Sequence, residues 1–225
     1  MFLMTGCATA PHFVVGVNSL RNPNSREISK YVLYPGSKDT DSNDLQFQEF
    51  AGILQQVLDK KGMSRVDNPA DADAAIFVVY GIGNPERHQY SYSIPTFGQT
   101  GGGSASYSGS SYGSGGAVYT QGTVYEQPTF GVTGSVAGTG EYTTFSRYLF
   151  LTAIDADLYR KTNKEIQLWN TRIVSVGSSG DLRWVLPFMI AGAEQMIGTD
   201  TGRMIEVSLS ESDERVAELR GKKSP

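Results

Sequence analysis

Cysteine and histidine are scarce in this chain. Among its 225 residues there is one cysteine, Cys7, and there are two histidines, His12 and His88. A disulfide within the chain needs two cysteines, and a zinc site needs several cysteine or histidine ligands at short spacing. The sequence therefore excludes an intrachain disulfide, and we predict neither a metal site nor a cofactor.

Charge and long apolar runs are also limited. Charged residues make up 19% of the chain and the net charge is -4, so the basic surface that a nucleic-acid-binding protein needs is missing. No window of 18 apolar residues occurs, so the body is not predicted to span a membrane as a helix. Between Arg87 and Glu141 the only charged residue is Glu126, and Gly, Ser, Thr and Tyr dominate. We predict that this window is an insertion with its own character.

The single cysteine lies in a short motif near the start of the sequence. The stretch MTGC (4–7) resembles a bacterial lipobox, in which the cysteine is acylated and becomes the mature N-terminus. Ala8 follows, as in lipoproteins sorted to the outer membrane. A secretory signal needs a basic segment and an apolar segment of about 7 to 15 residues. Six residues precede Cys7, so we expect the true start to lie upstream. The alternative is an incidental cysteine.

Hydrophobic periodicity predicts one α+β domain over residues 12–211. A three-to-four spacing of apolar residues predicts a helix over 44–61, with Gly62 after its end, and a second helix is predicted to begin at Pro187. The predicted strands cover 12–20, 29–36, 74–83, 144–159, 165–177 and 203–211. The expected class is α+β, with a mainly antiparallel sheet, helices packed on one face and a flexible Gly/Ser/Tyr-rich insertion. Residues 1–11 are expected to form a tether and 212–225 a polar tail.

The insertion over 98–140 is predicted to be a flexible loop or ribbon, because its backbone entropy is large and its apolar content small. The preceding stretch 87–95 alternates between apolar and polar residues, as a strand with two unlike faces does. Tyrosine offers a large amphipathic contact area at low rotamer cost. The residues predicted to bind an envelope protein or glycan are Tyr90, Tyr92, Tyr107, Tyr112, Tyr119 and Tyr125. Two alternatives remain: a disordered insertion without a specific role, and a hairpin that several subunits assemble into a pore.

No group of residues in the sequence indicates catalysis. Asp155 and Asp157 are two residues apart on a predicted strand, so they can form a carboxylate pair or bind Ca²⁺, but a solvent-facing sheet surface explains them more simply. The acidic stretch DNPADADA (67–74) lacks the Gly and the terminal Glu of an EF-hand loop. A surface position is the simpler interpretation of His88. We therefore predict that the protein is not an enzyme.

Several segments together resemble one family of bacterial proteins. They are the lipobox-like start, VLYPG (32–36), a helix that ends in KGM (61–63), the stretch ADADAAI (70–76) and the hairpin that carries IDADL (154–158) and Trp169. Their order is similar to that in the lipoproteins grouped as domain of unknown function 4136. The resemblance implies an envelope lipoprotein with a small α/β sandwich. It carries no catalytic signature.

These observations lead to one expected function and one alternative. We expect a non-enzymatic lipoprotein of the bacterial outer membrane, anchored through acylated Cys7 and facing the periplasm. Its role would be binding or scaffolding, with the segment 88–140 contacting an envelope protein or a glycan. The alternative is a subunit of an oligomeric outer-membrane secretion or assembly complex, which includes a homo-oligomer.

Overall fold

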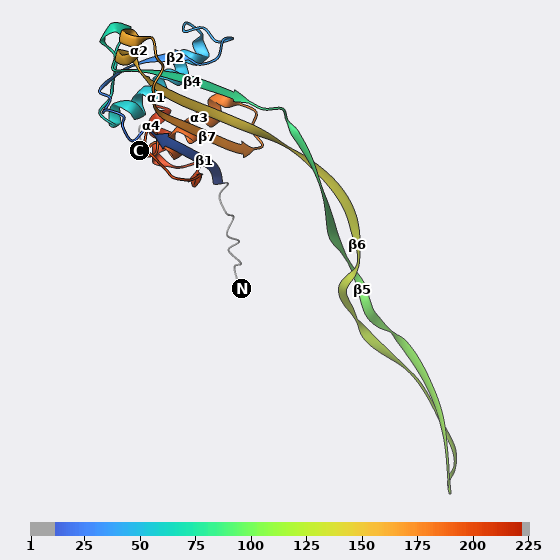
Figure 1. The fold of residues 1–225 in the computed structure, drawn as a ribbon. Coiled ribbons are helices and arrows are strands. Elements are labelled where there is room, and N and C mark those ends of the chain that lie inside the picture. Colours follow the sequence, from blue (N-terminus) through green and yellow to red (C-terminus); the bar gives the residue numbers. More distant parts are fainter. Residues whose placement is uncertain (1–11, 222–225) are drawn as a thin grey trace. The chain divides into compact units, whose positions relative to one another are not determined.

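The computed structural model describes residues 12–221, which form two compact units (Figure 1). The body contains residues 12–86 and 143–221, and the second unit is Arg87–Tyr142. The strands are β1 (His12–Arg21), β2 (Lys30–Pro35), β3 (Ser64–Arg65), β4 (Ala74–Ile82), β5 (Glu86–Gly113), β6 (Gly116–Asp155), β7 (Gln167–Gly177) and β8 (Ile205–Ser210). The helices are α1 (Leu45–Lys60), the 3₁₀ turn η1 (Pro69–Asp71), α2 (Ala156–Thr162), α3 (Leu182–Ala193) and α4 (Glu214–Leu219).

The strands of the body form one mixed sheet with the order β3-β2-β4-β6-β7-β1-β8, and β5 pairs with β6. The pairings of β2 with β3 and β4 are parallel, whereas the other pairings along this path are antiparallel. The predicted α+β class is therefore wrong. Strands account for 53% of residues 12–221 and helices for 21%, and the helices are few and lie at the periphery of the sheet. Local periodicity underestimated the strand content because it left open whether the insertion is a flexible loop or a ribbon.

Helix α1 confirms the helix predicted over 44–61. It begins after Asp44, whose side chain accepts a hydrogen bond from the backbone N–H of Phe47 at 2.9 Å. Gly62 follows the helix with a positive φ of 80°, which glycine adopts without strain. The buried stripe of α1 contains Phe47, Phe50, Ala51, Leu54, Val57 and Leu58, which join a core shared with one face of the sheet and with α3 and α4.

The C-terminal part of the body departs from prediction in two ways. Helix α3 begins at Leu182, after the N-cap Asp181, so Pro187 lies inside it and does not begin it. Proline inside a helix costs about 3 kcal/mol. Residues 185–193 are all buried, and their apolar burial offsets this cost. The prediction of a polar tail over 212–225 is also wrong for its first part, because α4 buries Val216 and Leu219 in the core.

The strand predicted over 144–159 ends earlier than expected. β6 stops at Asp155, whose side chain accepts a hydrogen bond from the backbone N–H of Leu158 at 2.9 Å and so caps α2. Alternation along the sequence did not reveal this change, because Asp is favoured both in turns and at helix N-caps. Asp155 and Asp157 therefore do not share the face of a strand.

The second unit is a two-stranded antiparallel ribbon formed by β5 and the first part of β6. Figure 1 shows the two strands twisting around each other along its length. Of the flexible loop and the ribbon that were predicted over 98–140, the structure has the ribbon, because this segment is strand except at a tight turn around 114–115. In residues 12–221 no helix is long and apolar enough to cross a membrane.

Candidate functional site

The base of the ribbon has two chemically different faces. Tyr90 and Tyr92 lie on one face, where each ring covers a glycine of the facing strand. A Cβ atom on Gly140 would lie 2.6 Å from Cζ of Tyr90, and a Cβ on Gly138 would lie 2.6 Å from Cζ of Tyr92. Each ring therefore occupies the space above a glycine on β6. Aromatic rings that cover cross-strand glycines stabilise strand pairs and fix their register.

The same face continues as a row of rings. The ring centroids of His88 and Tyr142 are 4.9 Å apart in a stacked arrangement. The Tyr90 ring lies 6.1 Å from that of Tyr142 and 6.0 Å from that of Tyr92. Tyr90 remains 51% exposed and Tyr92 44% exposed, although their rings contact their neighbours. These distances are in the range of favourable aromatic pairs.

Strand β6 supplies the other half of this surface, which sequence reasoning missed. The stretch VTGSVAGTGEY (132–142) alternates, and it places on one side Val132, Gly134, Val136, Gly138, Gly140 and Tyr142. Val132 and Val136 are exposed, as is Ile94 on β5. We call the surface formed by Tyr90, Tyr92, Ile94, Val132, Val136 and Tyr142 the apolar ribbon face. The sequence contains this alternation with a period of two residues, but it is hard to recognise because three of the positions on this side are glycines.

At the base of the ribbon, over residues 89–93 and at Glu141, the opposite face is polar. Gln89 donates a hydrogen bond from Nε2 to Oε1 of Glu141 at 2.7 Å, across the two strands. Ser91 and Ser93 alternate with the tyrosines and share the side of Gln89. The ribbon is therefore amphipathic at its base, with a polar side suited to water and an apolar side that remains uncovered.

The other predicted binding residues lie farther along the ribbon, and all of them are exposed: Tyr107, Tyr112, Tyr119 and Tyr125. Tyr107 repeats the arrangement at the base, because a Cβ on Gly122 would lie 2.6 Å from its hydroxyl oxygen. In the part of the chain that the structure describes, no aromatic stacking joins these four side chains. The structure thus groups Tyr90 and Tyr92 but not the four distal tyrosines.

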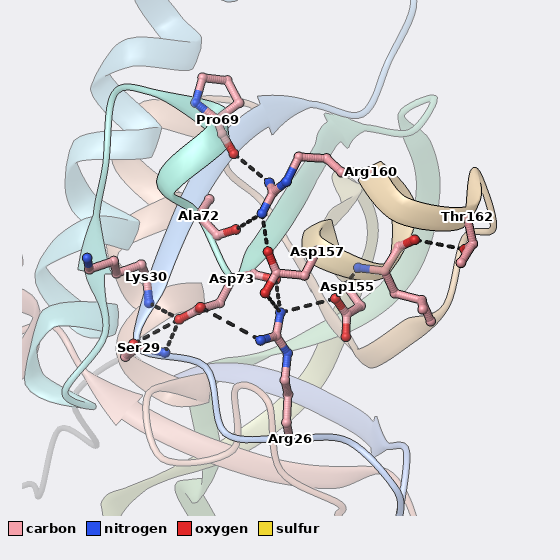
Figure 2. A network of polar contacts seen from close by, with 11 residues as sticks. Arg26, Ser29, Lys30, Pro69, Ala72, Asp73, Asp155, Asp157, Arg160 and Thr162 are labelled. Atoms are coloured by element: carbon pink, nitrogen blue, oxygen red, sulfur yellow. Dashed lines mark hydrogen bonds and ion pairs between the residues drawn. The ribbon is translucent and has the colours of Figure 1, made fainter.

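Asp155 and Asp157 take part in a network of ion pairs centred on Arg26 (Figure 2). The Arg26 guanidinium lies 3.1 Å from Oδ1 of Asp155 and 2.8 Å from Oδ2 of Asp157, and it also contacts Asp73 at 3.9 Å. Arg160 forms a second ion pair with Asp157. Hydrogen bonds from Arg26, and then from Arg160, hold the pKa of Asp157 below its ordinary value. Arginine side chains thus occupy the positions that a bound cation would need.

Asp73 connects this network to the start of β2. Its Oδ2 accepts hydrogen bonds from the backbone N–H of Lys30 at 2.8 Å, and from the backbone N–H and hydroxyl of Ser29 at 3.0 and 2.8 Å (Figure 2). Burial alone raises the pKa of Asp73, but these hydrogen bonds and the charge of Arg26 lower it overall. The network therefore fixes the start of β2 relative to β4.

Arg160 also connects two elements, α2 and η1, that line an apolar groove. From α2 it donates hydrogen bonds to the carbonyl oxygens of Pro69 at 2.7 Å and Ala72 at 3.0 Å, which ties α2 to η1 (Figure 2). This groove has a volume of about 370 Å³, and the rings of Tyr34 and Phe77 stack along it. The network is thus a structural support for this part of the body.

The remaining candidate residues are Cys7, His12 and His88. Cys7 lies outside the described residues. His12 is exposed at the first position of β1, and His88 stacks on Tyr142. Within residues 12–221, no three His, Cys, Asp or Glu side chains are grouped so that they could hold a metal ion.

Comparisons with known proteins leave the family undetermined. No family model matches the chain, and no curated protein matches it. Among solved structures, the chain is similar to a PDZ domain protein from Parabacteroides distasonis, with a TM-score of 0.39 and 12% identity. The similarity covers 88% of this chain and 39% of that protein. A similarity of this size supports no conclusion about function.

Proposed function

We propose that the protein is a non-enzymatic binding module of the bacterial envelope, which contacts its partner through the apolar ribbon face. Acyl chains on Cys7 hold it on the outer membrane, and the body carries the ribbon on the periplasmic side. One observation carries this proposal: an aromatic and aliphatic face stays exposed at the base of the ribbon, where the other face is polar.

The composition of the ribbon supports a binding role. Tyrosine is enriched where proteins bind one another, because its ring gives a large contact area and its hydroxyl tolerates water. The rings of Tyr90 and Tyr92 are held by their neighbours, so little rotamer freedom is lost when a partner covers them. The arginine pairs on Asp155 and Asp157 favour binding over catalysis, because these carboxylates already have partners.

A pair of charge substitutions tests the binding surface. Ile94→Glu places a carboxylate on the apolar ribbon face, whereas Ser93→Glu places the same group on the polar face one residue away. Native complexes are extracted from envelopes in a mild detergent, and their sizes are compared by native electrophoresis. We expect Ile94→Glu to release the protein from its complex and Ser93→Glu to leave the complex intact. Equal behaviour of the two variants, or a wild-type chain that runs alone, contradicts the proposal.

The anchor has a separate test. Each buried acyl CH₂ contributes about 0.8 kcal/mol, so two or more chains hold a protein stably on a membrane. In a chain expressed with its complete signal sequence, Cys7→Ser should move the protein from the membrane fraction to the soluble fraction. Unchanged fractionation would show that Cys7 is not the anchor. This outcome would leave the binding role of the ribbon standing.

A second candidate function is self-assembly through the same face. Two antiparallel strands alone are only marginally stable in water, so a ribbon of this length gains much from covering its apolar face. Glu126 is the only charged residue between Arg87 and Glu141, so two ribbons would approach each other with little repulsion. If this candidate holds, the purified chain sediments as an oligomer, Val136→Glu dissociates it and Ser135→Glu does not. A monomeric wild-type chain rules it out.

A further inference from the structure

Arg147 is a buried cation without a carboxylate partner. It is 2% exposed, on the part of β6 that pairs with β4 and β7. Its Nη1 donates a hydrogen bond to the carbonyl oxygen of Ser179 at 3.2 Å, and its Nη2 donates one to Oγ of Ser175 at 3.1 Å. Its Nε has no hydrogen-bond partner. Among residues 12–221, no Asp or Glu forms an ion pair with Arg147.

The protein compensates only part of the free-energy cost of burying the Arg147 charge. Burying a charge is costly unless an opposite charge and hydrogen bonds compensate for the lost water. The hydrogen bonds to Ser175 and Ser179 use two of the five N–H donors of the guanidinium. Phe13 adds a cation–π contact, with the guanidinium carbon 5.0 Å from the ring centroid. None of these neighbours carries a negative charge, and burial lowers the pKa of Arg147.

A pocket of about 240 Å³ has Arg147 in its lining. Besides Arg147, its lining includes Phe13 of β1, Trp184 of α3, and Ser178 and Ser179 in the loop between β7 and α3. The Phe13 and Trp184 rings meet edge to face, with centroids 6.3 Å apart. The pocket thus combines an aromatic wall with a cation and two serines. This is the usual composition of a small-ligand site, which is mostly apolar with a few polar groups that fix orientation.

We propose that this pocket binds a small organic carboxylate, whose oxygens pair with Arg147 and whose apolar body packs against Phe13 and Trp184. A guanidinium fits a carboxylate well, because its parallel N–H donors match the two oxygens. The volume admits a compact ligand, smaller than the drug-sized molecules that fill pockets of about 300 to 1,000 Å³. Two other titratable groups line the pocket, His12 and Glu211. The negative charge of Glu211 opposes the ligand, so it limits affinity.

Tryptophan fluorescence can measure this binding directly. Of the two tryptophans, Trp169 is buried in the core, while Trp184 is 37% exposed and lines the pocket. The full chain is titrated with phenylacetate and, as a matched uncharged control, with phenylacetamide. We expect phenylacetate to change the Trp184 emission in a saturable way and to bind at least about tenfold more tightly than the amide, since only the acid pairs with the cation.

Two variants identify the residues responsible. Arg147→Met keeps the bulk of the side chain in its buried position but removes the charge, and a well-packed apolar replacement of a buried charge is often tolerated. It should lose at least about tenfold in phenylacetate affinity, whereas Glu211→Gln should gain about two- to fivefold because a like charge is removed. Phenylacetate should also raise the Tm of the wild-type chain but not that of Arg147→Met.

Several results would overturn the proposal. They are equal affinities for the acid and the amide, no response to phenylacetate, unchanged binding by Arg147→Met, or weaker binding by Glu211→Gln. The Tm of each unliganded variant shows whether it is folded. If Arg147→Met does not fold, the comparison of acid with amide on the wild-type chain and the effect of Glu211→Gln still decide the question.

Discussion

The ring of Tyr92 lies directly over Gly138 on the facing strand of the ribbon, so that a Cβ added to this glycine would meet Cζ at 2.6 Å. Tyr90 and Gly140 repeat the relationship two residues away on each strand. The pairing explains why a segment rich in glycine and tyrosine forms strands: glycine provides the space, and tyrosine provides the apolar cover. It also leaves the outer side of each ring available to a partner.

Filling the space above Gly138 should loosen the ribbon. Gly138→Val pushes the Tyr92 ring away and removes a cross-strand contact worth about 1 kcal/mol. We expect protease cleavage within residues 87–142 to become about threefold to tenfold faster, while the body stays intact. Ala137→Val is the control, because it adds the same side chain on the opposite face one residue earlier. Equal cleavage of the two variants would show that the ring over the glycine does not stabilise the ribbon.

Arg26 should contribute to the stability of the body through its three carboxylate partners. In Arg26→Ala, Asp73 and Asp155 lose a shared cation and repel each other, and we expect the free energy of unfolding to fall by about 1–2 kcal/mol. Arg26→Lys should restore only part of this loss, because an ammonium cannot bridge several carboxylates as the guanidinium does. Urea denaturation measures both values. If Arg26→Lys has the same free energy of unfolding as the wild type, a positive charge alone explains the contribution of Arg26.

A more exposed ion pair provides the comparison for Arg26. Arg183 pairs with Glu49 through two hydrogen bonds, and these side chains are 66% and 39% exposed, whereas Arg26 is 40% exposed and its partners Asp73 and Asp155 only 25% and 14%. Exposed pairs contribute little, because water screens them and ordering the side chains costs entropy. Arg183→Ala should therefore shift the urea midpoint less than Arg26→Ala does. A larger shift for Arg183→Ala would contradict the importance of the less exposed carboxylates, Asp73 and Asp155, in the Arg26 network.

The sequence predicted some of these features and missed others for identifiable reasons. The helix 45–60 followed from its apolar spacing, and the turn at Gly62 agrees with local rules. A ribbon was only one of two alternatives for the insertion, and its register did not follow, because the pairing of Tyr92 with Gly138 is a long-range relationship that composition does not encode. Arg147 was also missed, since a buried arginine is distinguished from a surface one only by its surroundings.

Asp73 should make the body sensitive to acid. Its pKa is lower in the folded state than in the unfolded chain, where it is about 3.9, so the folded state binds this proton less readily. The stabilisation is present at neutral pH and is lost as the pH falls below about 4. Asp73→Asn should be less stable than wild type at pH 7, with a smaller difference at pH 3. Ser29→Ala, which removes a hydrogen bond of 2.8 Å to Asp73, should show part of the same change.

Urea midpoints at pH 7 and pH 3 test this expectation. If the difference between wild type and Asp73→Asn is the same at the two pH values, the ionised carboxylate is not the source of the stabilisation. A larger difference at pH 3 would reverse the sign of the linkage and contradict the lowered pKa.

The protein should become more stable when Tyr31 is replaced by phenylalanine. The tyrosine side chain is completely buried, and its hydroxyl has no hydrogen-bond partner. Burial of this hydroxyl also raises its pKa. A buried polar group without a partner costs about 1–3 kcal/mol, so Tyr31→Phe should raise the free energy of unfolding by about that amount. Thermal denaturation checks the direction, and a clear loss of stability would show that the hydroxyl has a favourable contact.

The central claim is that the apolar ribbon face is the binding surface of this protein, and site-specific photo-cross-linking in native envelopes tests it most directly. A photoreactive phenylalanine analogue is placed at position 94 on the apolar face or at position 93 on the polar face, in cells that express two differently tagged copies. We expect cross-links from position 94 alone, and the tags show whether the partner is a second copy or another molecule. Equal cross-linking from both positions, or none from position 94, would contradict the claim.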